Sequence, residues 1–162
     1  MHINPNRRMF LVAAGSIAGA SGMSFANTIL DTAPGHHAIM MLNAACGDDQ
    51  SINVFEPPIL RVALGDVVTF IPTDTGHNAA SRRGMIPDGV EPWNGGVDEE
   101  LTLEMNVPGV YGYVCTPHYE VGMVGLIVVG NDLSNLDAVR SVRQRGQAGT
   151  AFRALFDQLD AS

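Results

Sequence analysis

The sequence contains no lysine, and its nine positively charged residues are all arginines. Seventeen acidic residues oppose them, and the formal net charge is −8. An acidic chain excludes nonspecific binding to nucleic acid, which requires a basic surface. Long apolar runs are also missing: none approaches the roughly 20 residues that a membrane-spanning helix needs. The sequence therefore predicts neither a nucleic-acid-binding protein nor a stable association with a membrane.

The first 26 residues have the three parts of an export signal. Arg7 and Arg8 precede an apolar run at residues 9–20, and Ser24-Phe25-Ala26 matches a small-x-small cleavage site. The paired arginines also fit a twin-arginine signal, which leaves both Tat and Sec export open. A short N-terminal core helix is the alternative. We expect a soluble, periplasmic protein that begins near Asn27 and carries seven arginines against seventeen acidic residues.

Only two cysteines are present, Cys46 and Cys115. In an exported protein, two cysteines could form one disulfide. Alternatively, Cys115 is a metal-binding thiolate and Cys46 is a buried or turn residue without a function. A disulfide would rule out the second interpretation, because its sulfur could not act as a thiolate ligand.

Between residues 36 and 130, short apolar segments alternate with turns. Residues 101–107 show the strict period of two that is typical of a strand with one buried face. Six more strands are expected at 36–42, 51–55, 59–63, 66–71, 110–115 and 124–129. This regular spacing predicts an all-β sandwich at residues 27–130. Residues 73–98 are rich in Gly, Pro and Asp and are expected to form a long functional loop.

After Gly130 the apolar period changes to that of a helix. Apolar residues recur at helical spacing first from Leu133 to Val142 and then from Ala151 to Leu159. The pattern predicts two helices within residues 131–162, packed on the sandwich. Asp132 or Ser134 is expected to cap the first helix.

The motif with the strongest chemical meaning is Cys-x2-His-x4-Met, formed by Cys115, His118 and Met123. A thiolate, an imidazole and a thioether are soft donors that suit copper. A blue copper site has two His and one Cys in a plane with a weak axial Met, so a second His is needed. His77 is the candidate, because it follows a strand that could end at the same pole of the sandwich.

Other interpretations of these residues remain open. Cys115 and His118 could be zinc ligands, core residues, or a nucleophile and its base, although a nucleophile would also need a third group and an oxyanion hole. Met85 is expected to be a packing or surface residue. His36 and His37 are adjacent on a strand, where side chains point to opposite faces, so we expect one exposed and one packed.

Several segments together resemble the pseudoazurins, a family of bacterial type 1 copper proteins with the cupredoxin fold. The matching segments are His77-Asn78, 84–89, 108–112, 115–118, 122–125, and also 54–57, 65–74 and the helices at 133–160. The resemblance implies an all-β Greek-key sandwich with two C-terminal α-helices. It also implies one type 1 copper held by His77, Cys115, His118 and Met123. The implied function is a monomeric, non-enzymatic electron carrier in the periplasm. A copper storage or delivery protein that uses the same ligands is the alternative.

The resemblance further implies redox partners in denitrification, above all nitrite reductase, with a cytochrome c as a possible donor. Family members surround the exposed copper His with lysines that meet an acidic patch on the reductase. Here only Arg82 and Arg83 are basic near the His77 loop in sequence, and Glu120 stands two residues after His118. The usual electrostatic contact with a partner is therefore not expected.

We instead expect an apolar contact around the edge of His118. Met85, Ile86, Pro87 and Val121 are the residues predicted to form it. Charge steers association rate and salt dependence more than affinity, so an apolar contact should depend little on salt.

Overall fold

The computed structural model describes residues 33–161. The predicted export signal at residues 1–26 lies outside this range. Within it, eight strands and one 3-10 turn precede two α-helices. The elements are β1 (His36–Ala45), β2 (Asp48–Glu56), β3 (Ile59–Val62), β4 (Val67–Ile71), β5 (Ala80–Ser81), β6 (Leu101–Glu104), β7 (Gly109–Val114), η1 (Tyr119–Val121), β8 (Val124–Val129), α1 (Leu136–Ser141) and α2 (Ala148–Asp160).

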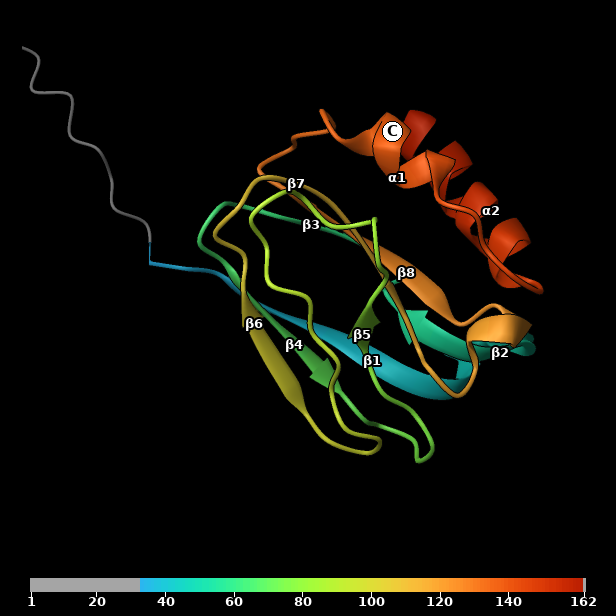
Figure 1. Cartoon of the computed structure of the whole chain (residues 1–162). Coiled ribbons are helices and arrows are strands. Elements are labelled where there is room, and N and C mark those ends of the chain that lie inside the picture. Colours follow the sequence, from blue (N-terminus) through green and yellow to red (C-terminus); the bar gives the residue numbers. More distant parts are fainter. Residues whose placement is uncertain (1–32, 162) are drawn as a thin grey trace, which may run out of the picture. The chain divides into compact units, whose positions relative to one another are not determined.

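The strands form two four-stranded sheets that face each other (Figure 1). One sheet has the order β2-β1-β4-β6 and the other the order β3-β8-β7-β5. The pairs β1–β4 and β3–β8 are parallel, whereas the remaining neighbours are antiparallel. The predicted all-β sandwich with two C-terminal helices is therefore confirmed. None of the helices in residues 33–161 has the length and apolar character needed to cross a membrane.

Aromatic rings fill the space between the two sheets. Phe55, Phe70 and Tyr113 are buried and meet edge to face, with ring centroids 4.8–6.2 Å apart. Such edge-to-face pairs are favourable beyond the apolar area that they bury. Gly125 is required beside Tyr113, because a Cβ atom there would clash with the phenol ring.

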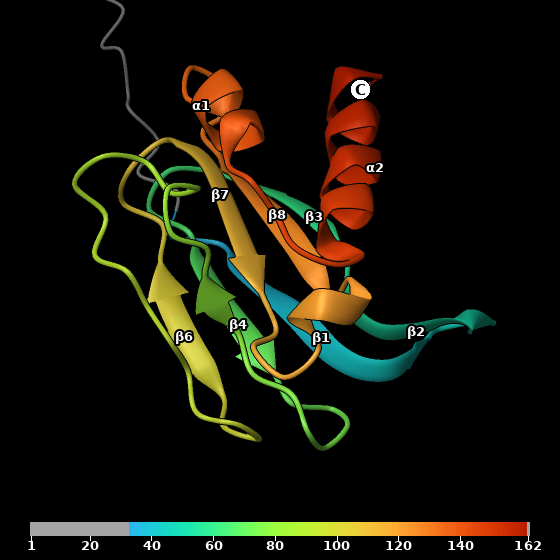
Figure 2. The ribbon, with the colours of Figure 1, turned by 45° about the vertical axis from the view of Figure 1, so that its right-hand side comes forward.

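A second apolar cluster joins the sheet of β7 and β8 to the helices, which cover its outer face (Figure 2). All six residues of β7 and all six of β8 are buried, because both faces of these strands are covered. Phe152 and Phe156 provide the stacked rings on the buried face of α2. This double burial holds β7 and β8, and therefore the loop between them, in a rigid frame.

Two local expectations differ from the structure. Residues 73–98 contain the two-residue strand β5, which pairs with β7 and is too short to show a period in the sequence. The residue before α1 is Asn135, and it does not cap the helix with its side chain. Instead, the Asn135 side chain accepts a hydrogen bond from the N–H of Val110 and donates one to its carbonyl. Asp132 accepts a hydrogen bond from the N–H of Ser134 ahead of the helix.

Asp66 ties the start of β1 to the turn before β4. Its carboxylate accepts hydrogen bonds from the ring of His37 and from the N–H groups of Ala63 and Gly35, at 2.7–2.9 Å. The bond from His37 contributes most to holding the pKa of Asp66 below its ordinary value, followed by the two backbone bonds. Because the folded-state pKa is lowered, the stabilisation is present above a pH of about 4 and is lost as the pH falls through the folded-state value.

We expect Asp66→Asn to lower the free energy of unfolding at neutral pH, with a difference from the wild type that shrinks below a pH of about 4. Denaturant titrations at a series of pH values measure this. Asp157→Asn is the control, because Asp157 is exposed on α2. It should leave the free energy of unfolding unchanged at both neutral and acidic pH. A difference that stays constant from neutral to acidic pH would contradict the role given to the Asp66 carboxylate.

Candidate metal centre

Three predicted ligands meet at one end of the sandwich. The donor atoms of His77, Cys115 and His118 lie within 4.8 Å of one another. The Cys115 sulfur is 3.8 Å from Nδ1 of His77 and 3.6 Å from Nδ1 of His118, and the two Nδ1 atoms are 3.1 Å apart. Metal bonds to imidazole nitrogen and thiolate are about 2.0–2.3 Å long, so one ion can reach three donors at these separations. The fold thus supplies a compact set of two nitrogen donors and one sulfur donor.

The loop between β7 and β8 owes its shape to its own backbone. The N–H of Cys115 donates to the carbonyl of Met123, and the N–H of Met123 donates to the carbonyl of His118. Gly122 has a φ of 102°, a left-handed conformation that glycine adopts without a Cβ clash. These bonds close the loop and hold Cys115, His118 and Met123 together. Met123 is buried, with 1% of its surface exposed.

His77 arrives from the loop that follows β4, as predicted, and is fully buried. Its Nε2 lies 2.9 Å from the side-chain oxygen of Asn43, which can only accept a hydrogen bond. The proton of neutral His77 is therefore on Nε2, which leaves a lone pair on Nδ1, the atom that faces Cys115 and His118. Burial lowers the pKa of His77, and the neighbouring His118 lowers it further. Both effects favour the neutral, ligating form.

Asn43 was missed by the sequence analysis. It lies on β1, 34 residues before His77, in a segment whose only pattern is that of a strand. No spacing rule connects the two residues. The pairing of β1 with β4 brings them together, because His77 lies beyond the end of β4.

Asn78 fastens the His77 loop to the loop between β7 and β8. Its side-chain oxygen accepts a hydrogen bond from the N–H of Thr116 at 2.7 Å, and its amide nitrogen donates to the Thr116 hydroxyl and to the carbonyl of Gly95. A third contact of the amide nitrogen is the side chain of Asn94. Asn78 is 3% exposed, so the two loops share one buried polar connection.

The sulfur of Cys115 lies in an apolar setting with two backbone donors. Burial raises the pKa of the Cys115 thiol, whereas hydrogen bonds from the N–H groups of Asn78 and His118 lower it. A buried thiol of this kind is inert unless a cation displaces its proton, and a metal ion does so.

The remaining candidates do not enter the site. Cys46 is exposed and Cys115 is buried, and both are free, so the disulfide considered above is not formed. His36 is exposed and His37 binds Asp66, which confirms the expected division between them. Met85 is fully buried, and its sulfur accepts a hydrogen bond from Gln144, so it is a packing residue.

The predicted apolar contact surface is wrong in two of its four members. Met85 and Pro87 are buried, and Pro87 packs against Gly109, away from the surface. Ile86 is half-buried, and only Val121 is well exposed, at 51%. Met85 and Pro87 read as apolar surface in the sequence, but Met85 packs against β7 at Gly112 and Pro87 packs against Gly109, so neither can meet a partner.

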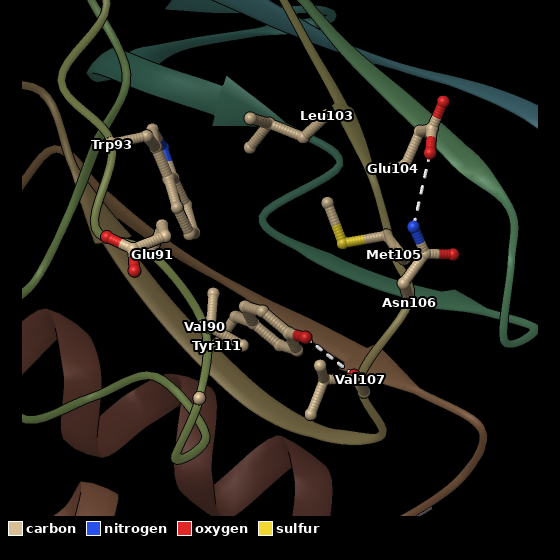
Figure 3. A pocket seen from close by; sticks show the side chains of 10 residues that line it. Val90, Glu91, Trp93, Leu103, Glu104, Met105, Asn106, Val107 and Tyr111 are labelled. Atoms are coloured by element: carbon tan, nitrogen blue, oxygen red, sulfur yellow. Dashed lines mark hydrogen bonds between the residues drawn. The ribbon is translucent and has the colours of Figure 1, made fainter.

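A hollow of about 260 Å³ lies at the other end of the sandwich. Trp93, Met105 and Tyr111 form its apolar wall, with the carboxylates of Glu91 and Glu104 beside it (Figure 3). Glu104 pairs with Val67 at the start of β4, whereas His77 follows the end of β4. The hollow is therefore separate from the donor cluster.

Comparison with known proteins agrees with this geometry. Residues 42–130 match the model of copper-binding proteins of the plastocyanin/azurin family. A pseudoazurin of Methylorubrum extorquens is 38% identical over 149 residues, which cover 92% of this chain and 95% of that protein. A pseudoazurin of Paracoccus pantotrophus is 40% identical over 112 residues, covering 69% of this chain and 75% of that one.

The structure is also similar to solved pseudoazurins. That of Sinorhizobium meliloti superimposes with a TM-score of 0.73 at 39% identity, covering 77% of this chain and 96% of the other. The strands run from His36 to Val129, which is a smaller share of the chain than the 77% that superimposes. The likeness therefore extends beyond the sandwich. The resemblance noted in the sequence is confirmed by both kinds of comparison.

Proposed function

Because the chain belongs to the plastocyanin/azurin family of copper-binding proteins, we propose that it is a one-electron carrier whose copper is held by His77, Cys115, His118 and Met123. The donor set supports this, since two imidazoles, a thiolate and a thioether are the ligands of blue copper sites. Zinc is less suited, because structural zinc sites in proteins rarely use Met. Copper supplies the Cu(II)/Cu(I) couple when it is bound.

The protein's part is to keep the ligands in one arrangement in both oxidation states. Asn43 fixes the tautomer of His77, and Asn78 holds the His77 loop against the loop between β7 and β8. The backbone N–H groups of Asn78 and His118 donate to the sulfur of Cys115 and so stabilise its negative charge. Little needs to rearrange when an electron arrives or leaves.

The observation that carries the proposal is the difference in burial among the four ligands. Cys115, His77 and Met123 are at most 1% exposed, whereas His118 is only half-buried. An electron can therefore pass between a partner and the site most directly through the ring of His118. A buried site with one ligand at the surface suits electron exchange better than the transfer of the ion itself.

We further propose that the carrier works in the periplasm as a monomer and does not turn over a substrate. Its partners are then redox proteins, such as a nitrite reductase as acceptor and a cytochrome c as donor. The predicted export signal at residues 1–26 and the relatives named pseudoazurin support this assignment.

A visible spectrum and a voltammogram of the copper-loaded protein test the proposal. An electron carrier should show an intense charge-transfer band when oxidised and a reversible one-electron wave. A storage or delivery protein should be colourless and should lose copper to a competing chelator. A colourless copper-loaded protein would overturn the proposed function.

A further inference from the structure

Four arginines gather on one side of the candidate metal centre. Arg82 and Arg83 lie in the turn after β5, and Arg143 and Arg145 lie in the linker between α1 and α2. About 60 residues separate the two segments in sequence. We call these four residues the arginine face. Only its first two members are visible from the sequence near the His77 loop.

Hydrogen bonds hold the two segments together. The guanidinium of Arg82 donates to the side-chain oxygen of Gln144 at 3.1 Å and to the carbonyl of Arg143 at 3.4 Å. The amide of Gln144 donates to the sulfur of Met85, and Val142 packs close to Gly84. The arginine face is therefore a built surface with a defined shape.

Tyr119 connects the arginine face to the loop between β7 and β8. It directly follows His118 and begins η1. Its hydroxyl donates to the side-chain oxygen of Gln144 at 2.8 Å and accepts a hydrogen bond from the N–H of Arg145 at 3.0 Å. The guanidinium of Arg82 lies 4.9 Å from the centre of the Tyr119 ring, which is a cation–π contact. The positive charges thus begin one residue from the half-buried ligand.

The charges of the arginine face are free to act on a partner. Arg83, Arg143 and Arg145 are exposed, and among the side chains that the structure describes no carboxylate forms an ion pair with any of the four. Glu120, which is exposed on η1, is the acidic residue of the loop between β7 and β8. The four positive charges therefore outweigh the one negative charge of the loop between β7 and β8, in a protein that is strongly acidic as a whole.

The opposite charge lies on the His77 side of the site. The carboxylate of Asp74 accepts a hydrogen bond from the N–H of Asn43, whose side chain lies 2.9 Å from His77, and the N–H of Asp98 donates to the carbonyl of His77. Asp98 accepts a hydrogen bond from the N–H of Gly76, which lies beside the ring of His118. In Figure 2, η1 lies between the α1–α2 linker and the loops that follow β4 and precede β6. The metal end is thus positive toward the linker and negative toward the His77 loop.

Resting on the proposed electron-carrier function, we propose that the arginine face is an off-centre docking surface for a carboxylate-rich patch on a redox partner. Asp74 and Asp98 repel the same patch, so the partner can approach in one orientation, over η1 and the linker. Guanidinium groups suit this role because they bind carboxylates through two parallel hydrogen bonds. The surface lies to one side of His118 and uses residues from two segments that only the fold unites.

Small redox ions of opposite charge test the local charge at this surface. The rate of oxidation of the Cu(I) protein by hexacyanoferrate(III), an anion, should fall as salt is added, although the whole protein is acidic. The double variant Arg143→Gln/Arg145→Gln should lower that rate by roughly tenfold at low ionic strength. With the cationic tris(phenanthroline)cobalt(III), the same variant should react as fast as the wild type or faster.

Arg61→Gln is the control, because it removes an exposed arginine of β3, outside the arginine face. It should change the rate with hexacyanoferrate(III) less than twofold. A wild-type rate that rises with salt, or a loss in Arg61→Gln equal to that in Arg143→Gln/Arg145→Gln, would overturn the proposal. The visible band and the reversible wave should be unchanged in both variants, so a colourless wild type would instead contradict the proposed function.

Polyglutamate, titrated into the 15N-labelled Cu(I) protein, tests the partner's chemistry. We expect NMR shift changes at Tyr119 and at residues 143–145, which Arg143→Gln/Arg145→Gln should abolish. Changes spread evenly over the surface, or centred on the loops of Asp74 and Asp98, would contradict a docking surface at the linker.

Discussion

Cys115→Ser is expected to abolish the visible charge-transfer band and the reversible one-electron wave of the copper-loaded protein. The band requires a thiolate on copper, and a hydroxyl is a harder donor with a far higher pKa. Serine nearly preserves the volume of the buried side chain, so the fold should persist. Absorption spectra and voltammetry after loading with one equivalent of copper measure the effect, and circular dichroism verifies that the variant is folded.

Cys46→Ser is the matched control for this experiment. Cys46 is exposed and free, and its backbone N–H donates to the carboxylate of Glu56 within the β1–β2 hairpin. Its replacement should leave both the band and the wave unchanged. If Cys115→Ser kept the band, or if Cys46→Ser lost it, the ligand assignment at Cys115 would be wrong.

Asn78→Ala should lower the free energy of unfolding of the metal-free protein by about 2–4 kcal/mol, because buried hydrogen bonds are lost and their partners are left unpaired. The partners are the N–H and hydroxyl of Thr116 and the carbonyl of Gly95. The backbone N–H of residue 78 remains, but the loop that positions it at the sulfur is released. We therefore also expect a shifted reduction potential.

Denaturant titration of the metal-free protein and voltammetry of the copper-loaded protein measure these two effects. Asn106→Ala is the control, since Asn106 is exposed and its side-chain amide donates a hydrogen bond to the exposed carboxylate of Glu104. This substitution should change the free energy of unfolding by no more than about 0.5 kcal/mol, as most surface substitutions do. An equal, small loss in both variants would show that Asn78 does not connect the two loops.

The sandwich was predictable because its strands leave a local signal. Alternating residues such as those at 101–104 mark a strand with one buried face, and turns between strands mark its ends. The two helices were predictable for the same reason, since their apolar residues recur at helical spacing. β5 left no such signal, because two residues cannot show a period, and Asn135 binds Val110 instead of acting as a capping residue.

Surface contacts were the least predictable feature. Met85 and Pro87 have the composition of an exposed apolar patch, yet they pack against β7 and Gly109. Arg143 and Arg145 read as an ordinary charged linker, yet they lie beside Arg82 and Tyr119. In both cases the neighbours are distant in the chain, so composition alone could not show which residues face solvent.

The order of residues in one short segment is enough to specify the chemistry of the candidate site. Cys115, His118 and Met123 stand within nine residues, so their soft donors must share one loop whatever the rest of the chain does. The surroundings of that loop depend on the packing of the whole domain. This packing brought Asn43 to the back of His77, left His118 as the half-buried ligand, and placed the arginine face beside it. These contacts join residues that are 34 to 62 positions apart, and such pairings depend on how the sheets and helices pack, which no local pattern encodes.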